Sequence, residues 1–317
     1  MTKLNDALLS IIIVSYNTAD LTAQTLISVK SSLEKSELLN RTEVFVVDNN
    51  SSDDSVKKIK SFQKKFIHFK LIENKDNIGF SGANNQAAQI ASGDYLLLLN
   101  SDTIVQRKAL EKLVTGAQKY KFDIAAAKLL NQDHSTQPQG GNLPSLITLF
   151  NHMFFLDDLP VIGRFFPSTQ NTGLNHTNTN KIHQTNNIQA KEVGWVGGTA
   201  MLISHNLWDK IGPLDEKIFM YGEDIEFCIR AKKHGAKIGI ITSSLIVHLG
   251  SASSSSKNAL LGELKGYIYI WKKHKPSWQM PILKLILRFG IILRIFLFGM
   301  ILRDPKGKVY LEALKVI

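Results

Sequence analysis

A short apolar run at residues 95–99, one Tyr followed by four Leu, ends abruptly in Asn100, Ser101 and Asp102. Its hydrophobicity is continuous rather than alternating, which is typical of a strand buried on both faces in a parallel sheet covered by helices. Ligands of open α/β sheets bind just outside the carboxyl ends of such strands. Asp102 is therefore the first candidate for a functional carboxylate.

Strand-like and helix-like segments alternate along the first 130 residues. Apolar runs predict buried strands at residues 8–14, 44–47, 69–72 and 96–99. Helical patterns lie between and after them, at residues 20–33, up to Phe62, up to Ala91 and at 108–120. This alternation predicts an α/β fold with a doubly wound, mostly parallel central sheet flanked by helices.

Three of the predicted strands end in polar residues. These ends are Ser15-Tyr16-Asn17, Asp48-Asn49-Asn50 and Asn100-Ser101-Asp102. Asn, Asp and Ser are also ordinary turn formers, so a single polar end would mean little. Because the carboxyl ends of parallel strands meet at one edge of the sheet, three such ends indicate a binding site there.

The second half of the chain begins with a polar tract at residues 168–190, rich in Asn, Thr and His, which predicts a mobile loop. Hydrophobic order returns at residues 193–203, where Gly197 and Gly198 follow Trp195. Glycines at this place allow the backbone to approach a ligand closely. A glycine-bent strand packed on the sheet explains the same residues equally well.

A helix is predicted from residue 223 to 234, with three acids in its first turn. Acids at a helix amino terminus are stabilising by roughly 0.3–1 kcal/mol, and Glu226 can pair with Arg230 one turn later. Glu223 and Asp224 are left as candidates for catalysis. Further on, His248 at a strand end is either structural or, together with Asp102, part of a divalent-cation site.

Composition limits the class of protein. With 317 residues, 44% of them hydrophobic, the chain can bury a sizeable core. The single cysteine, Cys228, excludes an internal disulfide and favours a reducing, cytoplasmic compartment. The first apolar run, residues 8–14, has the pattern of a strand rather than of a signal peptide.

The net charge of +11 is concentrated near the carboxyl terminus, where residues 257–317 hold twelve Lys and Arg against three acids. A nucleic-acid enzyme would carry this charge along a groove in its body, so no nucleic-acid partner is expected. Residues 280–302 are apolar but interrupted by Lys284, Arg288 and Arg294. These bases fall on one face of a helix, which predicts an amphipathic helix lying on an anionic membrane surface. An oligomerisation or core-packing helix is the alternative.

Seven short segments together resemble the inverting glycosyltransferases of family 2, which have the GT-A fold, and most closely their bacterial rhamnosyltransferase-like branch. The segments, spread over residues 10–253, are Ile13-Val14-Ser15-Tyr16-Asn17, Val46-Val47-Asp48-Asn49-Asn50-Ser51-Ser52-Asp53, Asn77-Ile78-Gly79-Phe80-Ser81-Gly82-Ala83-Asn84-Asn85, Leu99-Asn100-Ser101-Asp102, Trp195-Val196-Gly197-Gly198, Gly222-Glu223-Asp224-Ile225-Glu226 and His248. Each is weak by itself, but their order is that of the family.

The resemblance implies roles for the residues on the donor side. Ser15, Tyr16, Asn17 and Asp48 would hold the nucleoside of a sugar nucleotide, and Asn77 and Gly79 would lie near its base and ribose. Asp102 matches the last acid of the family's Asp-x-Asp motif and would bind Mg²⁺ or Mn²⁺ at the diphosphate, with His248 as a second ligand. Asn100 stands where the motif has its first acid, so this site has one carboxylate fewer, and Asn100 and Ser101 would contact the donor.

On the acceptor side, the resemblance implies that Asp224 is the catalytic base and Glu223 its possible substitute. Trp195, Gly197 and Gly198 would shape the site for the acceptor. A base is required because direct displacement at the anomeric carbon needs one group to take the proton of the acceptor hydroxyl.

These implications combine into one expected function. The chain would move a sugar, with rhamnose favoured, from dTDP-L-rhamnose or a UDP-sugar to a lipid-linked oligosaccharide during synthesis of a bacterial surface polysaccharide such as O-antigen, capsule or exopolysaccharide. It would work in the cytoplasm, attached peripherally to the inner leaflet of the cell membrane. A nucleotidyltransferase acting on sugar phosphates and a catalytically silent nucleotide-sugar binding protein are the alternatives.

The expected organisation has two parts. Residues 1–256 would form the GT-A domain, with a nucleotide-binding half at about 1–130 and an acceptor-side half at about 190–256. Residues 257–317 would form the helical segment that associates with the membrane.

Overall fold

The structure is a computed structural model that describes residues 6–159, 161–170, 190–250, 256–304 and 306–317. Most of the predicted loop at 168–190 lies outside the described residues. The described strands form a nine-stranded central sheet and a two-stranded ribbon. The central strands are β1 (Leu9–Ser15), β2 (Thr42–Asp48), β3 (His68–Glu73), β4 (Tyr95–Asn100), β5 (Thr103–Val105), β6 (Ile124–Leu130), β8 (Ala190–Glu192), β10 (Ala200–Ser204) and β11 (Ile238–His248), and the ribbon pairs β7 (Gly140–Gly141) with β9 (Trp195–Val196).

The order of strands in the central sheet is β3-β2-β1-β4-β10-β6-β11-β5, with β8 paired to β11. β3, β2, β1 and β4 are parallel neighbours, and β6 and β11 are also parallel. β10 is inserted antiparallel between β4 and β6. The predicted doubly wound, mostly parallel sheet is therefore confirmed, and the carboxyl ends of β1, β2 and β4 meet at one edge.

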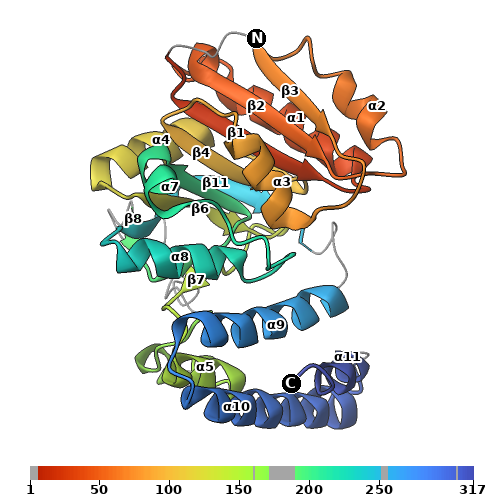
Figure 1. Cartoon of the computed structure of the whole chain (residues 1–317), viewed down its shortest axis with the longest axis vertical. Helices are drawn as coiled ribbons and strands as arrows, with labels where there is room; N and C mark the ends of the chain where they lie inside the picture. The colour runs from red at the N-terminus through yellow and green to blue at the C-terminus, as the bar shows by residue number, and fades with distance from the viewer. Residues whose placement is uncertain (1–5, 160, 171–189, 251–255, 305) are drawn as a thin grey trace.

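Helices cover both faces of the sheet (Figure 1). One face packs against α1 (Ala19–Leu33), α2 (Ser55–Lys60) and α4 (Ala109–Tyr120), and the other against α3 (Gly79–Ala88), α7 (His205–Ile211) and α8 (Glu223–Lys233). The leucines of β4 alternate between the two faces: Leu97 and Leu99 join the first core, and Leu96 and Leu98 join the second. Burial of both faces explains why this strand is apolar without alternation.

A group of four further helices lies beyond α8 (Figure 1). They are α5 (Leu146–Met153), α9 (Ser256–His274), α10 (Gln279–Arg294) and α11 (Lys306–Ala313), and a π-helical stretch, Ile295–Ile301, extends α10. Their buried side chains are continuous with the core on the α8 side of the sheet. In the described parts of the chain, no helix combines the length and the apolar character needed to cross a membrane.

The predicted helix at 280–302 is present. The expectation that all three of its basic residues share an exposed face is wrong for one of them. Arg294 is buried, and its guanidinium donates to the carbonyl oxygens of Met153 and, at 3.1 Å, of His152. These are the last residues of α5, where unpaired carbonyls and the helix dipole favour a positive charge. Arg294 therefore caps α5 instead of facing a membrane.

α9 approaches the loop before α8 closely because it presents two glycines one turn apart. A β-carbon added at Gly262 would lie 2.5 Å from the ring of Tyr221, and one at Gly266 would lie 2.6 Å from the Tyr221 carbonyl oxygen. On the other side of the contact, Gly222 has a φ of +107°, a conformation that favours glycine. A β-carbon added at Gly222 would lie 3.1 Å from the Cα of Gly266. Larger residues at these positions would separate α9 from the loop.

We predict that Gly266→Ala lowers the free energy of unfolding by about 1–3 kcal/mol, because the added methyl group overpacks a backbone contact. Helix propensity alone would favour Ala by about 1 kcal/mol. Gly299→Ala is the matched control, since its nearest neighbour would be 3.7 Å away, an ordinary contact. Urea denaturation measures both variants, and equal stabilities for the two would contradict the close packing of α9.

Candidate active site

A cavity of about 540 Å³ lies at the edge of the sheet where β1, β2 and β4 end. Five residues predicted from the sequence to contact the donor line it: Tyr16, Asn77, Gly79, Asn100 and Ser101. The loop before α8 and the helix α9 complete the wall. The residues that they add are Phe219, Met220, Tyr221, Asn258, Leu261, Gly262 and Lys265.

Other predicted donor residues do not line the cavity but hold loops next to it. Ser15 is fully buried, with its hydroxyl 3.2 Å from that of Thr18. The side-chain oxygen of Asn17 accepts from the backbone N–H of Ser52 at 2.8 Å. Asp48 is also buried, and its Oδ2 accepts from the N–H of Ser51 at 2.9 Å.

The second oxygen of Asp48, Oδ1, is buried and has no hydrogen-bond partner among the described residues. A buried acceptor without a partner is unfavourable by about 1–3 kcal/mol. The carboxylate therefore has an unused acceptor at the end of β2, directly before Asn49, which lines the cavity.

Asn49 was not among the predicted site residues. Its amide nitrogen donates to Asn77 Oδ1 at 2.8 Å and to the Gly79 carbonyl oxygen at 3.2 Å, while its oxygen accepts from Asn74 and from the N–H of Ile78. These bonds fix the loop between β3 and α3 against the end of β2. The sequence offered only its position directly after the acid at the end of a strand. That position does not distinguish a residue that contacts a ligand from one that holds a loop in place.

The structure brings Asp102 and His248 together. β5 pairs antiparallel with β11 in a register that sets Thr103 opposite His248, and the N–H of Leu249 donates to the Asp102 carbonyl oxygen at 2.9 Å. As a result His248 Nε2 lies 3.2 Å from Oδ1 of the fully buried Asp102. His248 Nδ1 lies 2.9 Å from Gln137 Oε1.

Asp224 lies at the start of α8 and faces the glycines that follow β9. Its Oδ2 accepts from the N–H of Gly198 at 3.0 Å, and its Oδ1 accepts from the N–H of Ile225 at 2.7 Å. A β-carbon at Gly198 would lie 3.3 Å from the ring of Phe80, which lines the cavity. The carboxylate therefore sits next to the cavity without forming part of its wall.

The two adjacent acids have different environments. Burial raises the pKa of Glu223 to about 8, and the charge of Asp224 adds to that increase. Burial also raises the pKa of Asp224, but the N–H groups of Gly198 and Ile225 oppose this increase by stabilising the carboxylate. With a pKa of about 8, Glu223 keeps its proton near neutral pH, while the two N–H groups that bind Asp224 favour its carboxylate form.

Trp195 does not have the position expected of a residue that contacts the acceptor. Its ring is buried in the core and its indole N–H donates to the Thr169 carbonyl oxygen at 2.7 Å. It thereby anchors the turn that carries Gly197 and Gly198. A β-carbon at Gly197 would lie 3.7 Å from Asp224 Oδ2, so the glycines, and not the Trp ring, border the carboxylate.

Comparison with known proteins identifies the family. The family model "Glycosyl transferase family 2" matches residues 10–184, more than half of the chain. The chain belongs to glycosyl transferase family 2.

Two curated relatives have names that describe sugar transfer. The low-salt glycan biosynthesis hexosyltransferase Agl10 of Haloferax volcanii is 29% identical over 204 residues, which cover 62% of this chain and 55% of that protein. The chain thus spans about half the length of this relative. An N-acetylglucosaminyl-diphospho-decaprenol L-rhamnosyltransferase of Mycobacterium tuberculosis is 24% identical over 268 residues, 79% of this chain and 81% of that protein.

Among solved structures, the mannosyltransferase PcManGT from Pyrobaculum calidifontis, in complex with GDP-Man and Mn²⁺, matches with a TM-score of 0.59 and 12% identity. The match covers 99% of this chain and 87% of that protein. This likeness establishes the GT-A fold. The chain is therefore a member of glycosyl transferase family 2 with the GT-A fold.

The residues at the predicted cation site suit a divalent ion in part. A carboxylate oxygen is an ordinary ligand of both Mn²⁺ and Mg²⁺, whereas an imidazole nitrogen suits a transition metal such as Mn²⁺ better than Mg²⁺. The described residues contain no group of three His, Cys, Asp or Glu side chains that could hold a metal. Asp102 and His248 would thus supply two ligands, and donor oxygens and water would have to supply the others.

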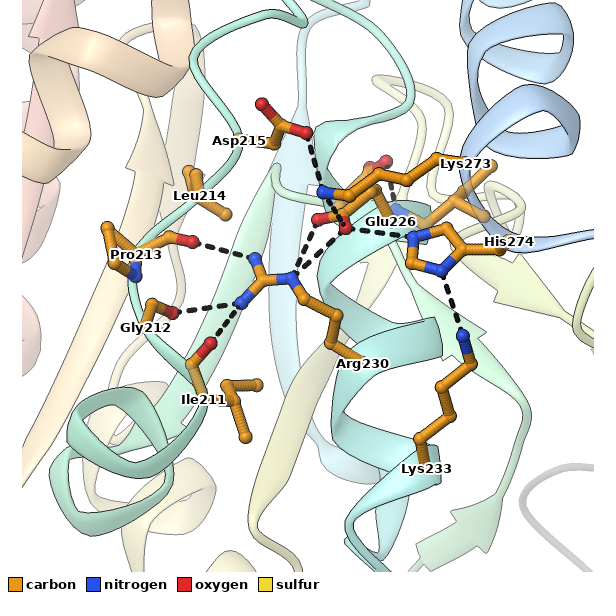
Figure 2. A network of polar contacts seen from close by, with 12 residues as sticks. Ile211, Gly212, Pro213, Leu214, Asp215, Glu226, Arg230, Lys233, Lys273 and His274 are labelled. Atoms are coloured by element: carbon orange, nitrogen blue, oxygen red, sulfur yellow. Dashed lines mark hydrogen bonds and ion pairs between the residues drawn. The ribbon is translucent and has the colours of Figure 1, made fainter.

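Further along α8, a buried ion cluster joins this helix to α9 (Figure 2). Glu226 is fully buried and binds Arg230 through Nε at 2.9 and 3.1 Å, Lys273 at 2.7 Å and His274 at 3.0 Å. Lys273 also binds Asp215 at 2.7 Å. Burial alone would raise the pKa of Glu226, yet its bonds to Lys273 and Arg230 outweigh burial and lower it.

We predict that Glu223 makes the stability of this protein depend on pH. Between the ordinary pKa of 4.5 and about 8, the unfolded chain releases a proton that the folded chain keeps. The free energy of unfolding should therefore fall, by on the order of a few kcal/mol, as the pH rises through this window. Glu223→Gln stays neutral and should lack this contribution to the decline.

Thermal melts at pH 5, 6.5 and 8 measure the effect. Glu34→Gln, which removes an exposed carboxyl on another part of the chain, should keep the wild-type decline. If the Glu223→Gln protein lost stability in parallel with the wild type, the raised pKa of Glu223 would be refuted.

Proposed function

We propose that this chain is an inverting glycosyltransferase that moves a sugar from a nucleoside-diphosphate sugar to a hydroxyl of a lipid-linked glycan acceptor. The observation that carries the proposal is the position of Asp224, a carboxylate held by two backbone N–H groups beside a cavity at the carboxyl edge of a doubly wound sheet. Nucleotide ligands of such sheets bind at this edge.

In this mechanism the sugar nucleotide occupies the cavity, and its sugar extends toward Gly197 and Gly198. Asp224 takes the proton of the acceptor hydroxyl as the oxygen attacks the anomeric carbon from the face opposite the leaving diphosphate. The transition state has oxocarbenium character, as in glycoside hydrolysis. A divalent cation, where bound by Asp102 and His248, would stabilise the negative charge of the leaving group.

Asp224→Asn should reduce turnover by roughly 10²–10⁴-fold, because the amide cannot accept the proton, while binding of UDP or dTDP should stay within about twofold of wild type. Asp209→Asn, at an exposed carboxyl on α7, should keep full turnover. Release of nucleoside diphosphate from a sugar-nucleotide donor measures the rate. Full turnover by Asp224→Asn would refute the assignment of the base.

The same assay distinguishes the alternatives. A nucleotidyltransferase would release pyrophosphate from a nucleoside triphosphate, and a silent binding protein would bind the donor without turnover. The donor proposed first is dTDP-L-rhamnose, with a UDP-sugar second. The name of the mycobacterial relative supports both a rhamnosyl donor and a lipid diphosphate-linked acceptor. The expected pathway is assembly of a surface polysaccharide.

We further propose that α10 holds the enzyme at the inner leaflet of the cell membrane, where such an acceptor is found. One stripe of the helix is apolar and exposed, and its residues follow one another at spacings of three or four. They are Ile282, Leu285, Phe289, Ile292, Phe296 and Met300, each 39–68% exposed. At 100° per residue the stripe is roughly 80° wide.

The charges of α10 are arranged around this stripe. The buried Arg294 projects from the opposite side, whereas Lys284 and Arg288 follow one edge of the stripe. An apolar stripe with bases beside it fits a helix lying in the headgroup region of an anionic bilayer. The stripe, and not the basic face expected from the sequence, is the surface that would enter the membrane.

Ile292→Ser should weaken binding to vesicles of phosphatidylglycerol and phosphatidylcholine by on the order of tenfold, because it removes apolar area from the interface. Ile27→Ser is the matched control, as Ile27 is 58% exposed on a helix of the sheet domain. Vesicle cosedimentation of the full chain measures both. Equal binding by the wild type and Ile292→Ser would overturn the membrane assignment of the stripe.

A further inference from the structure

The wall that α9 adds to the donor cavity comes from one face of the helix. Asn258, Leu261, Gly262 and Lys265 line the cavity, and their spacing of three or four residues places them on the same side of α9. The face is held there by the contacts of Gly262 and Gly266 with the loop before α8. Lys265 is followed by Gly266, which packs against Gly222. Gly222 in turn directly precedes the two acids of α8.

Lys265 differs in charge from the rest of the cavity. Among the described lining residues, all other side chains are apolar, amide, hydroxyl or phenol groups, so Lys265 brings the one formal charge. A nucleoside diphosphate, by contrast, carries at least two negative charges at neutral pH. A cavity that binds it with neutral groups alone would leave these charges uncompensated.

The surroundings of Lys265 leave its ammonium available. Lys273, two turns further along α9, is bound by Asp215 and Glu226. Lys265 is exposed and has no ion pair with any described residue. Its three donors can therefore turn to an anion in the cavity without breaking an existing bond.

We infer that Lys265 binds the diphosphate of the donor and is a positioning and charge-neutralising residue for the reaction. The inference rests on the proposed function, since it assumes a nucleoside-diphosphate sugar in the cavity. Asn100 makes this contribution more important. An amide at the end of β4, where the family motif has a carboxylate, contributes one anionic ligand fewer for a metal that would neutralise the phosphates.

Titration calorimetry of the full chain with UDP and dTDP, each compared with uridine and thymidine, tests the inference. Lys265→Met keeps an unbranched side chain, one heavy atom shorter, and removes its charge. It should weaken binding of the diphosphate by roughly tenfold or more and leave binding of the nucleoside unchanged. Lys265→Arg should restore most of the affinity, and the loss should shrink at high salt because a charge interaction is screened.

Lys272→Met is the matched control. It removes the same charge from an exposed position on the same helix, outside the cavity lining, so binding of the diphosphate should not change. Thermal melts of all three variants verify that they are folded.

Two failures are distinguishable. If the wild type binds neither diphosphate more tightly than the corresponding nucleoside, the proposed function is overturned. If the wild type prefers a diphosphate and Lys265→Met binds it as tightly as the wild type, the function stands and the role of Lys265 is refuted. An equal loss in Lys265→Met and Lys272→Met would also refute it, because only general electrostatics would then be at work.

Discussion

The cavity at the carboxyl edge of the sheet depends on the close approach between α9 and the loop that precedes α8. Backbone meets backbone where Gly266 packs on Tyr221 and Gly222, and neighbouring residues of both segments line the cavity. The same loop leads directly into Glu223 at the start of α8. One steric condition, the absence of side chains at two helix positions, therefore sets both the wall of the cavity and the origin of the helix that carries the acids.

The buried cluster around Glu226 holds the far end of α9 in a different way. Removing a carboxylate from water is unfavourable by several kcal/mol, and attraction to Arg230, Lys273 and His274 repays this only when the geometry is good. Such a cluster adds little net stability compared with apolar packing. Any position of α9 that left Glu226 without its ion pairs would be unfavourable. The main effect of the cluster is therefore to fix the orientation of α9, whose close approach the two glycines permit.

Much of the sheet could be predicted because continuous apolar strands and their polar ends follow from burial on both faces. Asp102 was placed correctly at such an end, although only the register of β5 against β11 shows that His248 meets it. The contribution of α9 could not be predicted, because helical periodicity identifies a face but not its partner. Arg294 was misplaced for the same reason: the carbonyls that bind it belong to α5, which is 141 residues away in sequence.

The distribution of charge links the two sides of the site. If Glu223 and Asp224 were both ionised, two negative charges would lie beside the cavity that we propose for an anionic donor, and each would repel the phosphates of that donor. Burial raises the pKa of Glu223 to about 8, so this side chain keeps its proton near neutral pH, and backbone N–H groups stabilise the carboxylate form of Asp224. Lys265 adds a positive charge on the donor side. In the proposed mechanism, the base on α8 and the positive charge of α9 at the donor would thus lie on different sides of the site.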